Sequence, residues 1–127
     1  IMEFDDKVPI YFQIEQYVCS QIINQSWAPG AKVPAVRQLA LTLSVNGNTV
    51  QRALTELIQN RILESRRGLG NFVTTDPEIL AQLRQQEIDA QFEQVQTHLA
   101  ALQLSPEEML GAFSNYLRNH TKGEHHE

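Results

Sequence analysis

Basic side chains are concentrated between residues 29 and 73 of this 127-residue chain. That basic segment holds six lysines and arginines against two acidic residues, a net charge of +4, whereas the whole chain has a net charge of −5. The six basic residues are Lys32, Arg37, Arg52, Arg61, Arg66 and Arg67. Positive charge clustered within an acidic protein indicates a surface that binds a polyanion, and phosphate groups are the simplest candidate.

Polar side chains suited to hydrogen bonding with base edges occur in the middle of the basic segment. Asn46 is typical of an N-cap, so a helix is expected to start directly after it. Its buried stripe is expected to consist of Val50, Ala53, Leu54, Leu57 and Ile58. Its opposite face presents Gly47, Asn48, Gln51, Arg52 and Thr55. A helix with a polar, hydrogen-bonding face and no large exposed hydrophobe fits the major groove of DNA.

The elements around this helix complete a helix-turn-helix with a wing. A four-residue apolar spacing predicts a helix over Ile10–Asn24, and a Pro-Gly pair predicts a turn at Trp27–Gly30. A second helix is indicated by the apolar residues Val36, Leu39, Ala40 and Leu43. Beyond the third helix, Ile62–Ser65 and Asn71–Thr74 are expected to be the strands of a hairpin. The hairpin is closed by Arg66, Arg67, Gly68, Leu69 and Gly70, whose glycines let the backbone approach a phosphate or the floor of the minor groove.

Charge and periodicity both change near residue 75. Residues up to Thr75 have a net charge of +1, and those from Asp76 onward have −6. The second region is predicted to contain a long amphipathic helix and a shorter one that starts at the capping box Ser105-Pro106-Glu107-Glu108. Because two helices cannot bury all their apolar side chains, a second chain is expected to cover Leu80, Leu83, Phe92, Val95, Leu99, Phe113 and Leu117. We therefore expect a mainly α protein with a small β-wing: a DNA-binding domain over residues 1–75 and a helical dimerisation region over residues 76–127.

Composition and motifs limit the alternatives. No apolar run approaches the roughly 20 residues that span a bilayer, so no membrane association is expected, and the single cysteine, Cys19, fits a reducing cytoplasm. The chain has no Gly-rich phosphate loop, no nucleophile elbow and no paired Cys/His cluster, so neither an enzyme nor a cofactor is expected. The histidines do not have the spacing of a zinc site, so no metal is expected at His98, His120, His125 or His126.

Four stretches of the chain resemble the GntR family of bacterial transcriptional regulators in order and spacing. They are PIYFQIEQYVCSQII, PGAKVPAVRQLA, VNGNTVQRAL and RRGLGNFV, which together extend from Pro9 to Val73. The NGNTV sequence and the short helical tail are similar to the YtrA-like subfamily, which implies a winged-helix dimer that represses its own operon. The resemblance also implies contacts with the operator from Arg37, Asn48, Thr49, Arg52, Arg66, Arg67, Gly68 and Gly70.

Several positions depart from the family pattern. Ala35 replaces a serine before the second helix, and Gly47 replaces a proline after the capping asparagine. Gln51 stands where many relatives have arginine, so a different base preference is expected. Leu69 stands at the wing tip, where relatives often have a polar or basic residue, so a weaker or purely steric contact with the minor groove is expected.

These observations lead to the hypothesis of a sequence-specific transcriptional repressor that binds a palindromic operator in double-stranded DNA as a homodimer. Two recognition helices would enter successive major grooves about 34 Å apart. Asn48, Gln51 and Thr55 would contact base edges, and the arginines would anchor phosphates. Two alternatives stay open: a winged-helix scaffold for protein interactions, and a sensor that holds a small-molecule effector of unknown identity at the dimer interface.

Overall fold

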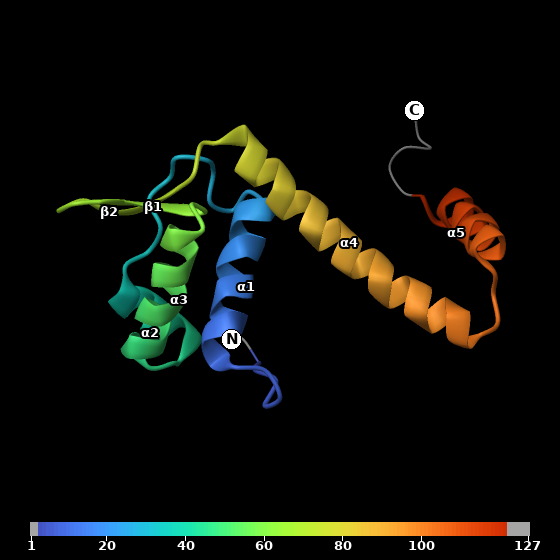
Figure 1. Ribbon diagram of the computed structural model, residues 1–127, viewed down its shortest axis with the longest axis horizontal. Helices are drawn as coiled ribbons and strands as arrows, with labels where there is room; N and C mark the ends of the chain where they lie inside the picture. The colour runs from blue at the N-terminus through green and yellow to red at the C-terminus, as the bar shows by residue number, and fades with distance from the viewer. Residues whose placement is uncertain (1–2, 122–127) are drawn as a thin grey trace. The chain divides into compact units, whose positions relative to one another are not determined.

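The computed structural model describes residues 3–121, which form two compact units (Figure 1). The first unit ends at Gln85 and the second begins at Gln86. The elements are α1 (Ile10–Ile23), α2 (Val36–Leu43), α3 (Gly47–Gln59), β1 (Leu63–Arg66), β2 (Gly70–Val73), α4 (Pro77–Ala101) and α5 (Pro106–His120). The prediction of a mainly α protein with a small β-wing is confirmed for the described residues.

Local sequence explains where the two helices of the helix-turn-helix end and begin. α2 stops at Ser44, which adopts the left-handed conformation with φ +58°. α3 starts at the expected N-cap, because Asn46 Oδ1 accepts a hydrogen bond from the Asn48 N–H at 2.7 Å. α2 has no such cap, since Ala35 makes no side-chain hydrogen bond to the helix start. The turn between the helices is therefore fixed from both sides, by the left-handed Ser44 with the Val45 N–H donating to the Ala40 carbonyl at 3.0 Å, and by the Asn46 cap of α3.

The hydrophobic core of the first unit draws on all of its elements. α1 and α2 both pack against α3, which also contacts β1. The most deeply buried side chains are Ile14, Val18, Val33, Leu39, Val50, Leu54, Leu57, Leu63 and Val73. Leu83 of α4 joins this core, and Leu80 packs against it. The first unit consequently extends beyond residue 75, because the change in charge and periodicity marks the beginning of α4 and not the end of the core.

The wing is an antiparallel hairpin in which Leu63 pairs with Val73 and Arg66 with Gly70. Arg66 and Gly70 were predicted to lie in the loop, but they form the last pair of the ladder, so the loop is shorter than predicted. Lys32 adds an isolated bridge to β2, and the Val33 N–H donates to the Asn71 carbonyl at 2.8 Å. The base of the wing is thus tied to the core, while the hairpin projects beyond α2 and α3 (Figure 1).

The second unit contains most of α4 and all of α5. α4 ends at Ala101; Gln103 beyond it lies in the left-handed region at φ +71°, and the Leu104 N–H donates to the Leu99 carbonyl at 3.2 Å. The predicted capping box is confirmed: Ser105 Oγ accepts from the Glu108 N–H at 3.2 Å, and Glu108 Oε1 accepts from the Ser105 N–H at 2.8 Å. None of the helices described is long and apolar enough to cross a membrane.

Candidate nucleic-acid interface

The exposed face of α3 carries the polar residues that the sequence predicted. Asn48, Gln51, Arg52 and Thr55 are exposed, and Gly47 and Thr49 are half-buried. Gln51 Nε2 donates to Thr55 Oγ1 at 3.2 Å, so these two side chains lie together one turn apart. The opposite face is buried through Val50, Ala53, Leu54 and Leu57. α3 is therefore fixed on the core, and its polar face stays accessible to a ligand.

A hollow of about 530 Å³ lies between α2 and the start of α3. It is lined by Val36, Arg37, Ala40, Leu41, Gly47, Asn48 and Gln51. Arg37 is exposed there, beside two amide side chains, which is a combination that contacts phosphates and base edges. Leu41 exposes 76% of its surface and was not anticipated, because a single apolar residue one turn after Arg37 gives no charge or motif signal.

The two wing arginines are placed differently. Arg66 stacks on Phe72, with 4.2 Å between the guanidinium carbon and the ring centroid, and its Nη2 lies 3.2 Å from Glu64 Oε1. Arg67 is exposed at the turn and has no ion pair within residues 3–121. Of the two, Arg67 is the cation that a phosphate can approach without displacing an existing partner.

Lys32 lies beside the wing and was missed as a site residue. A Cβ on Gly70 would come within 2.9 Å of Lys32 Cε, so the lysine side chain runs directly over that glycine. Gly70 also has φ +115°, a conformation that favours glycine. The sequence could not place Lys32 here, because the isolated bridge to Phe72 brings together residues that are far apart in the chain.

Arg52 is oriented toward α1. Its guanidinium carbon lies 3.8 Å from the centroid of the Tyr11 ring, which is a cation–π contact. The side chain is still exposed, so it lies at the edge of the polar face of α3 and not at its centre. The predicted contact of Arg52 with DNA therefore has to be made from this edge.

A carboxyl pair, the buried Glu15 and the half-buried Glu56, links α1 to α3 next to Arg52. Glu15 exposes 9% of its surface, and its Oε2 has no hydrogen-bond partner among the described residues. Burial, a side-chain hydrogen bond with Glu56 and the charge of Glu56 raise the pKa of Glu15 from 4.5 to about 7, against the positive charge of Arg52. A hydrogen bond between two carboxyls requires a proton on one of them. Sequence reasoning missed the pair because its members are on different helices.

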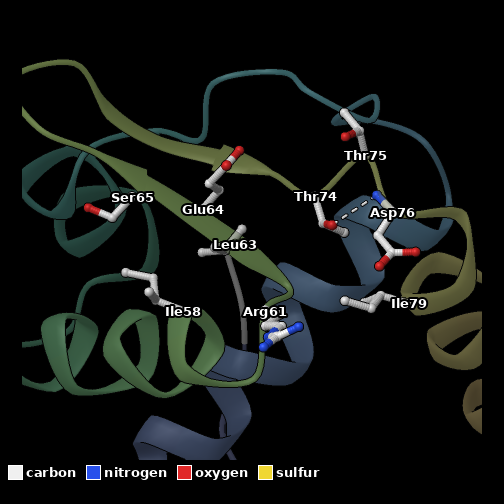
Figure 2. A pocket seen from close by; sticks show the side chains of 9 residues that line it. All are labelled: Ile58, Arg61, Leu63, Glu64, Ser65, Thr74, Thr75, Asp76 and Ile79. Atoms are coloured by element: carbon white, nitrogen blue, oxygen red, sulfur yellow. Dashed lines mark hydrogen bonds between the residues drawn. The ribbon is translucent and has the colours of Figure 1, made fainter.

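A separate recess of about 460 Å³ lies where β2 leads into α4 (Figure 2). Thr74 Oγ1 accepts from the Asp76 N–H at 3.0 Å, and Asp76 Oδ1 accepts from the Glu78 N–H at 2.9 Å. Arg61, with φ +66°, lines this recess on the side of Ile79 (Figure 2). Arg61 is therefore part of the connection to α4 and does not join the wing arginines.

The histidines of the tail form no described metal site. Within residues 3–121 no group of three or more His, Cys, Asp or Glu side chains could hold a metal ion. His120 stacks on Tyr116 with 4.0 Å between ring centroids, and its Nδ1 lies 2.8 Å from the Tyr116 carbonyl oxygen. His125 and His126 lie outside the described residues.

The residues expected at a dimer interface fall into two groups. Leu80 and Leu83 pack in the first unit, and Leu83 exposes only 8% of its surface. The expectation that Leu83 faces a second chain therefore has to be corrected, because the winged helix itself covers this side chain. The other group lies in the second unit and consists of the half-buried Leu99 and the exposed residues Phe92, Val95, Phe113 and Leu117.

Comparison with known proteins identifies the family. The sequence model of the bacterial regulatory proteins of the gntR family matches residues 10–73. The chain belongs to the GntR family. It is 32% identical over 114 residues to the uncharacterized HTH-type transcriptional regulator YhcF of Bacillus subtilis, covering 90% of this chain and 94% of YhcF. It is 35% identical over 94 residues to the HTH-type transcriptional repressor YtrA of the same organism, covering 66% of this chain and 72% of YtrA.

Solved structures share the fold of this GntR protein. A GntR family transcriptional regulator from Listeria monocytogenes has a TM-score of 0.78 and 32% identity, covering 88% of this chain and 98% of that chain. AraR(DBD) in complex with the operator ORR3 has a TM-score of 0.52 and 26% identity, covering 58% of this chain and 89% of that chain. The GntR protein described here is a DNA-binding transcriptional regulator with a winged helix-turn-helix.

Proposed function

We propose that this GntR protein is a YtrA-like repressor that binds a two-fold symmetric operator as a homodimer. The observation that carries the proposal is the polar face of α3, which shares a hollow with the exposed Arg37 of α2. Repression is supported by the similarity to YtrA, which is named a transcriptional repressor. The basic charge of the same segment favours DNA over a protein partner, because a protein scaffold has no need for clustered arginines.

In this docking α3 enters the major groove. Asn48, Gln51 and Thr55 contact base edges, since amide and hydroxyl groups can both donate and accept hydrogen bonds. The hydrogen bond from Gln51 to Thr55 holds the Gln51 amide in place before DNA binds. Thr49, half-buried near the start of α3, contacts the sugar-phosphate backbone of the DNA beside the major groove.

Phosphate contacts surround the reading residues in this proposal. Arg37 binds a phosphate from α2, and Arg52 binds one from the edge that faces α1. From the wing, Arg66 and Arg67 contribute positive charge. Because it has no Cβ, Gly68 lets its backbone N–H group approach the sugar-phosphate chain closely, whereas the space beside Gly70 is filled by the Lys32 side chain.

The second unit supplies the contact between two copies. A groove of about 470 Å³ is lined by Phe92, Val95, Gln96, Leu99, Pro106, Met109, Leu110 and Phe113. Leu110 exposes 74% of its surface, and no residue of α5 is buried. Folding of a single chain thus leaves a largely apolar groove in water. A second copy offers the same apolar helices, and a two-fold arrangement lets each chain cover the groove of the other.

Selection of binding sites from random-sequence DNA tests this function. We expect enrichment of an inverted repeat whose half-sites are about one helical turn apart, bound by two copies of the chain. A reporter gene with that repeat in its promoter should lose expression when the protein is present. An asymmetric site bound by one copy, or activation of the reporter, would contradict a homodimeric repressor. Binding without any sequence enrichment would contradict base contacts from α3.

A further inference from the structure

An exposed apolar side chain stands at the tip of the wing. Leu69 exposes 60% of its surface and belongs neither to the hydrophobic core nor to the residues packed around it. Its N–H donates to the Arg66 carbonyl at 2.9 Å, which closes the turn. Gly68 and Gly70 on either side have φ values of +74° and +115°, so the turn that presents Leu69 depends on residues without a Cβ. Leu69 packs on no core residue, so its side chain is available for contact with a ligand of the wing.

The wing carries this side chain from α3 toward the neighbouring groove. β1 begins only a few residues after α3 ends, and each strand of the hairpin has four residues. Four residues in a strand extend about 13 Å, which is enough to cross the phosphate chain that borders the major groove. The inference rests on the docking proposed above, with α3 in the major groove, and it places the wing tip at the adjacent minor groove.

We propose that Leu69 makes the wing a reader of the minor groove that excludes G·C pairs. At the centre of the groove floor, adenine has an apolar C2–H where guanine has an amino group. The leucine side chain packs against C2–H, but it cannot accept a hydrogen bond from the amino group. Covering that group with Leu69 leaves a buried donor without a partner, which is costly. A·T and T·A pairs are both accepted at this position, because neither has the amino group.

Arg67 offers a different explanation for the same preference. Arginine is attracted to the strongly negative potential of the narrow minor groove at A·T-rich DNA, which depends on groove shape and not on the amino group itself. Arg67 is exposed next to Leu69, whereas Arg66 is held by Glu64 and Phe72. The test therefore has to separate the side chain of Leu69 from the charge of Arg67.

Adding or removing a single amino group in the minor groove of the DNA separates the effect of the Leu69 side chain from that of the Arg67 charge. The operator is first selected from random-sequence DNA with the full-length protein. Each adenine that flanks the half-sites is then replaced, one at a time, by 2,6-diaminopurine, which adds the amino group in the minor groove and leaves the major groove unchanged. Guanines introduced at the same positions are replaced by inosine, which removes the amino group. Affinity is measured by fluorescence anisotropy at fixed salt.

We expect one position in each half-site where diaminopurine weakens binding of the wild-type protein on the order of tenfold, and where inosine restores the affinity lost with guanine. Leu69→Ala should reduce the effect of diaminopurine to less than about twofold, because the smaller side chain leaves the amino group accessible to water. Arg67→Ala should weaken binding to every sequence and keep the tenfold effect. Leu102→Ala, which changes a similarly exposed leucine (67%) outside the wing, should behave as the wild type does.

Three results would overturn the proposal. Diaminopurine could have no effect at any flanking position, its effect could persist in Leu69→Ala, or its effect could disappear in Arg67→Ala. In each case the protein still binds its selected operator, so the proposed function stands without this inference. Failure of the wild-type protein to select any operator would instead refute the docking on which the inference rests.

Discussion

Glutamine in place of Glu15 is expected to stabilise the protein at neutral and alkaline pH and to leave its stability in acid nearly unchanged. Burial, followed by the hydrogen bond with Glu56 and the charge of Glu56, raises the pKa of Glu15 from 4.5 to about 7. Between these pH values the folded protein holds a proton that the unfolded chain has released. The contribution of this group to the free energy of unfolding is therefore complete below pH 4.5 and is lost as the pH rises toward 7.

The expected size of the effect follows from the shift. Each pKa unit corresponds to about 1.4 kcal/mol, so a rise from 4.5 to about 7 sets an upper bound of about 3 kcal/mol. Glu15 itself exposes only 9% of its surface, but Glu56 is half-buried and Arg52 is exposed, so solvent screens their charges and makes the effect smaller than this upper bound. Glutamine keeps the size of the side chain and a donor toward Glu56, but it has no charge to desolvate. Arg52, which partly offsets the shift in the wild type, then faces the Glu56 carboxylate alone.

Urea unfolding of the full-length protein between pH 5 and pH 8 measures this difference. Fluorescence of Trp27 reports on the first unit, where its ring packs edge-on against Tyr17 at 6.2 Å. The advantage of Glu15→Gln over the wild type should grow with pH and level off above about pH 7. Glu3→Gln, which changes an exposed carboxylate outside the core, should produce no such pH dependence. A difference between wild type and Glu15→Gln that stays constant from pH 5 to pH 8 would refute the carboxyl pair.

Four further predictions concern DNA binding and assembly. Gln51→Ala should cost about 1–3 kcal/mol on the selected operator and little on random DNA; equal losses in a mobility shift would mean that Gln51 contacts no base. Arg67→Ala should make the slope of log affinity against log salt shallower by about 0.9, and an unchanged slope would remove Arg67 from the phosphate contacts. A protein ending at Gln85 should fold and sediment as a monomer with weak operator binding, whereas one ending at Thr75 should be less stable by about 2–5 kcal/mol because it lacks Leu83. Phe92→Asp should dissociate the proposed dimer of the full-length protein, and a dimer that survives either this change or the truncation at Gln85 would place the interface in the winged helix.

Local signals were sufficient to predict the fold. The cap at Asn46, the capping box at Ser105 and the glycines of the wing each depend on residues only a few positions apart, and the structure confirms all three elements. Periodicity likewise identified the buried side of α3 correctly. These signals are strong because helix caps and tight turns impose specific backbone requirements on particular residue types.

Contacts between distant residues could not be predicted in the same way. The sequence pattern of an apolar residue in α4 is the same whether its side chain packs on its own chain or on a second one. For this reason Leu83 was predicted at the dimer interface, although it is buried in the first unit. Lys32 reaches the wing only through its bridge to β2, and Glu15 meets Glu56 only because α1 packs on α3. No spacing along the chain encodes these neighbours, since each depends on how separate elements pack.

The polar face of α3 has two rows of side chains, one accessible to DNA and one in contact with α1. The sequence pattern does not distinguish the two rows. Gln51 and Thr55 form a row one turn apart that is joined by a hydrogen bond and accessible to DNA. Arg52 and Glu56 form the neighbouring row, which meets Tyr11 and Glu15 of α1. The first row can change without affecting the packing of α3, because its members touch each other and solvent. The second row couples the orientation of α3 to α1, so a change at Arg52 should affect both its proposed phosphate contact and the position of the residues proposed to contact the bases.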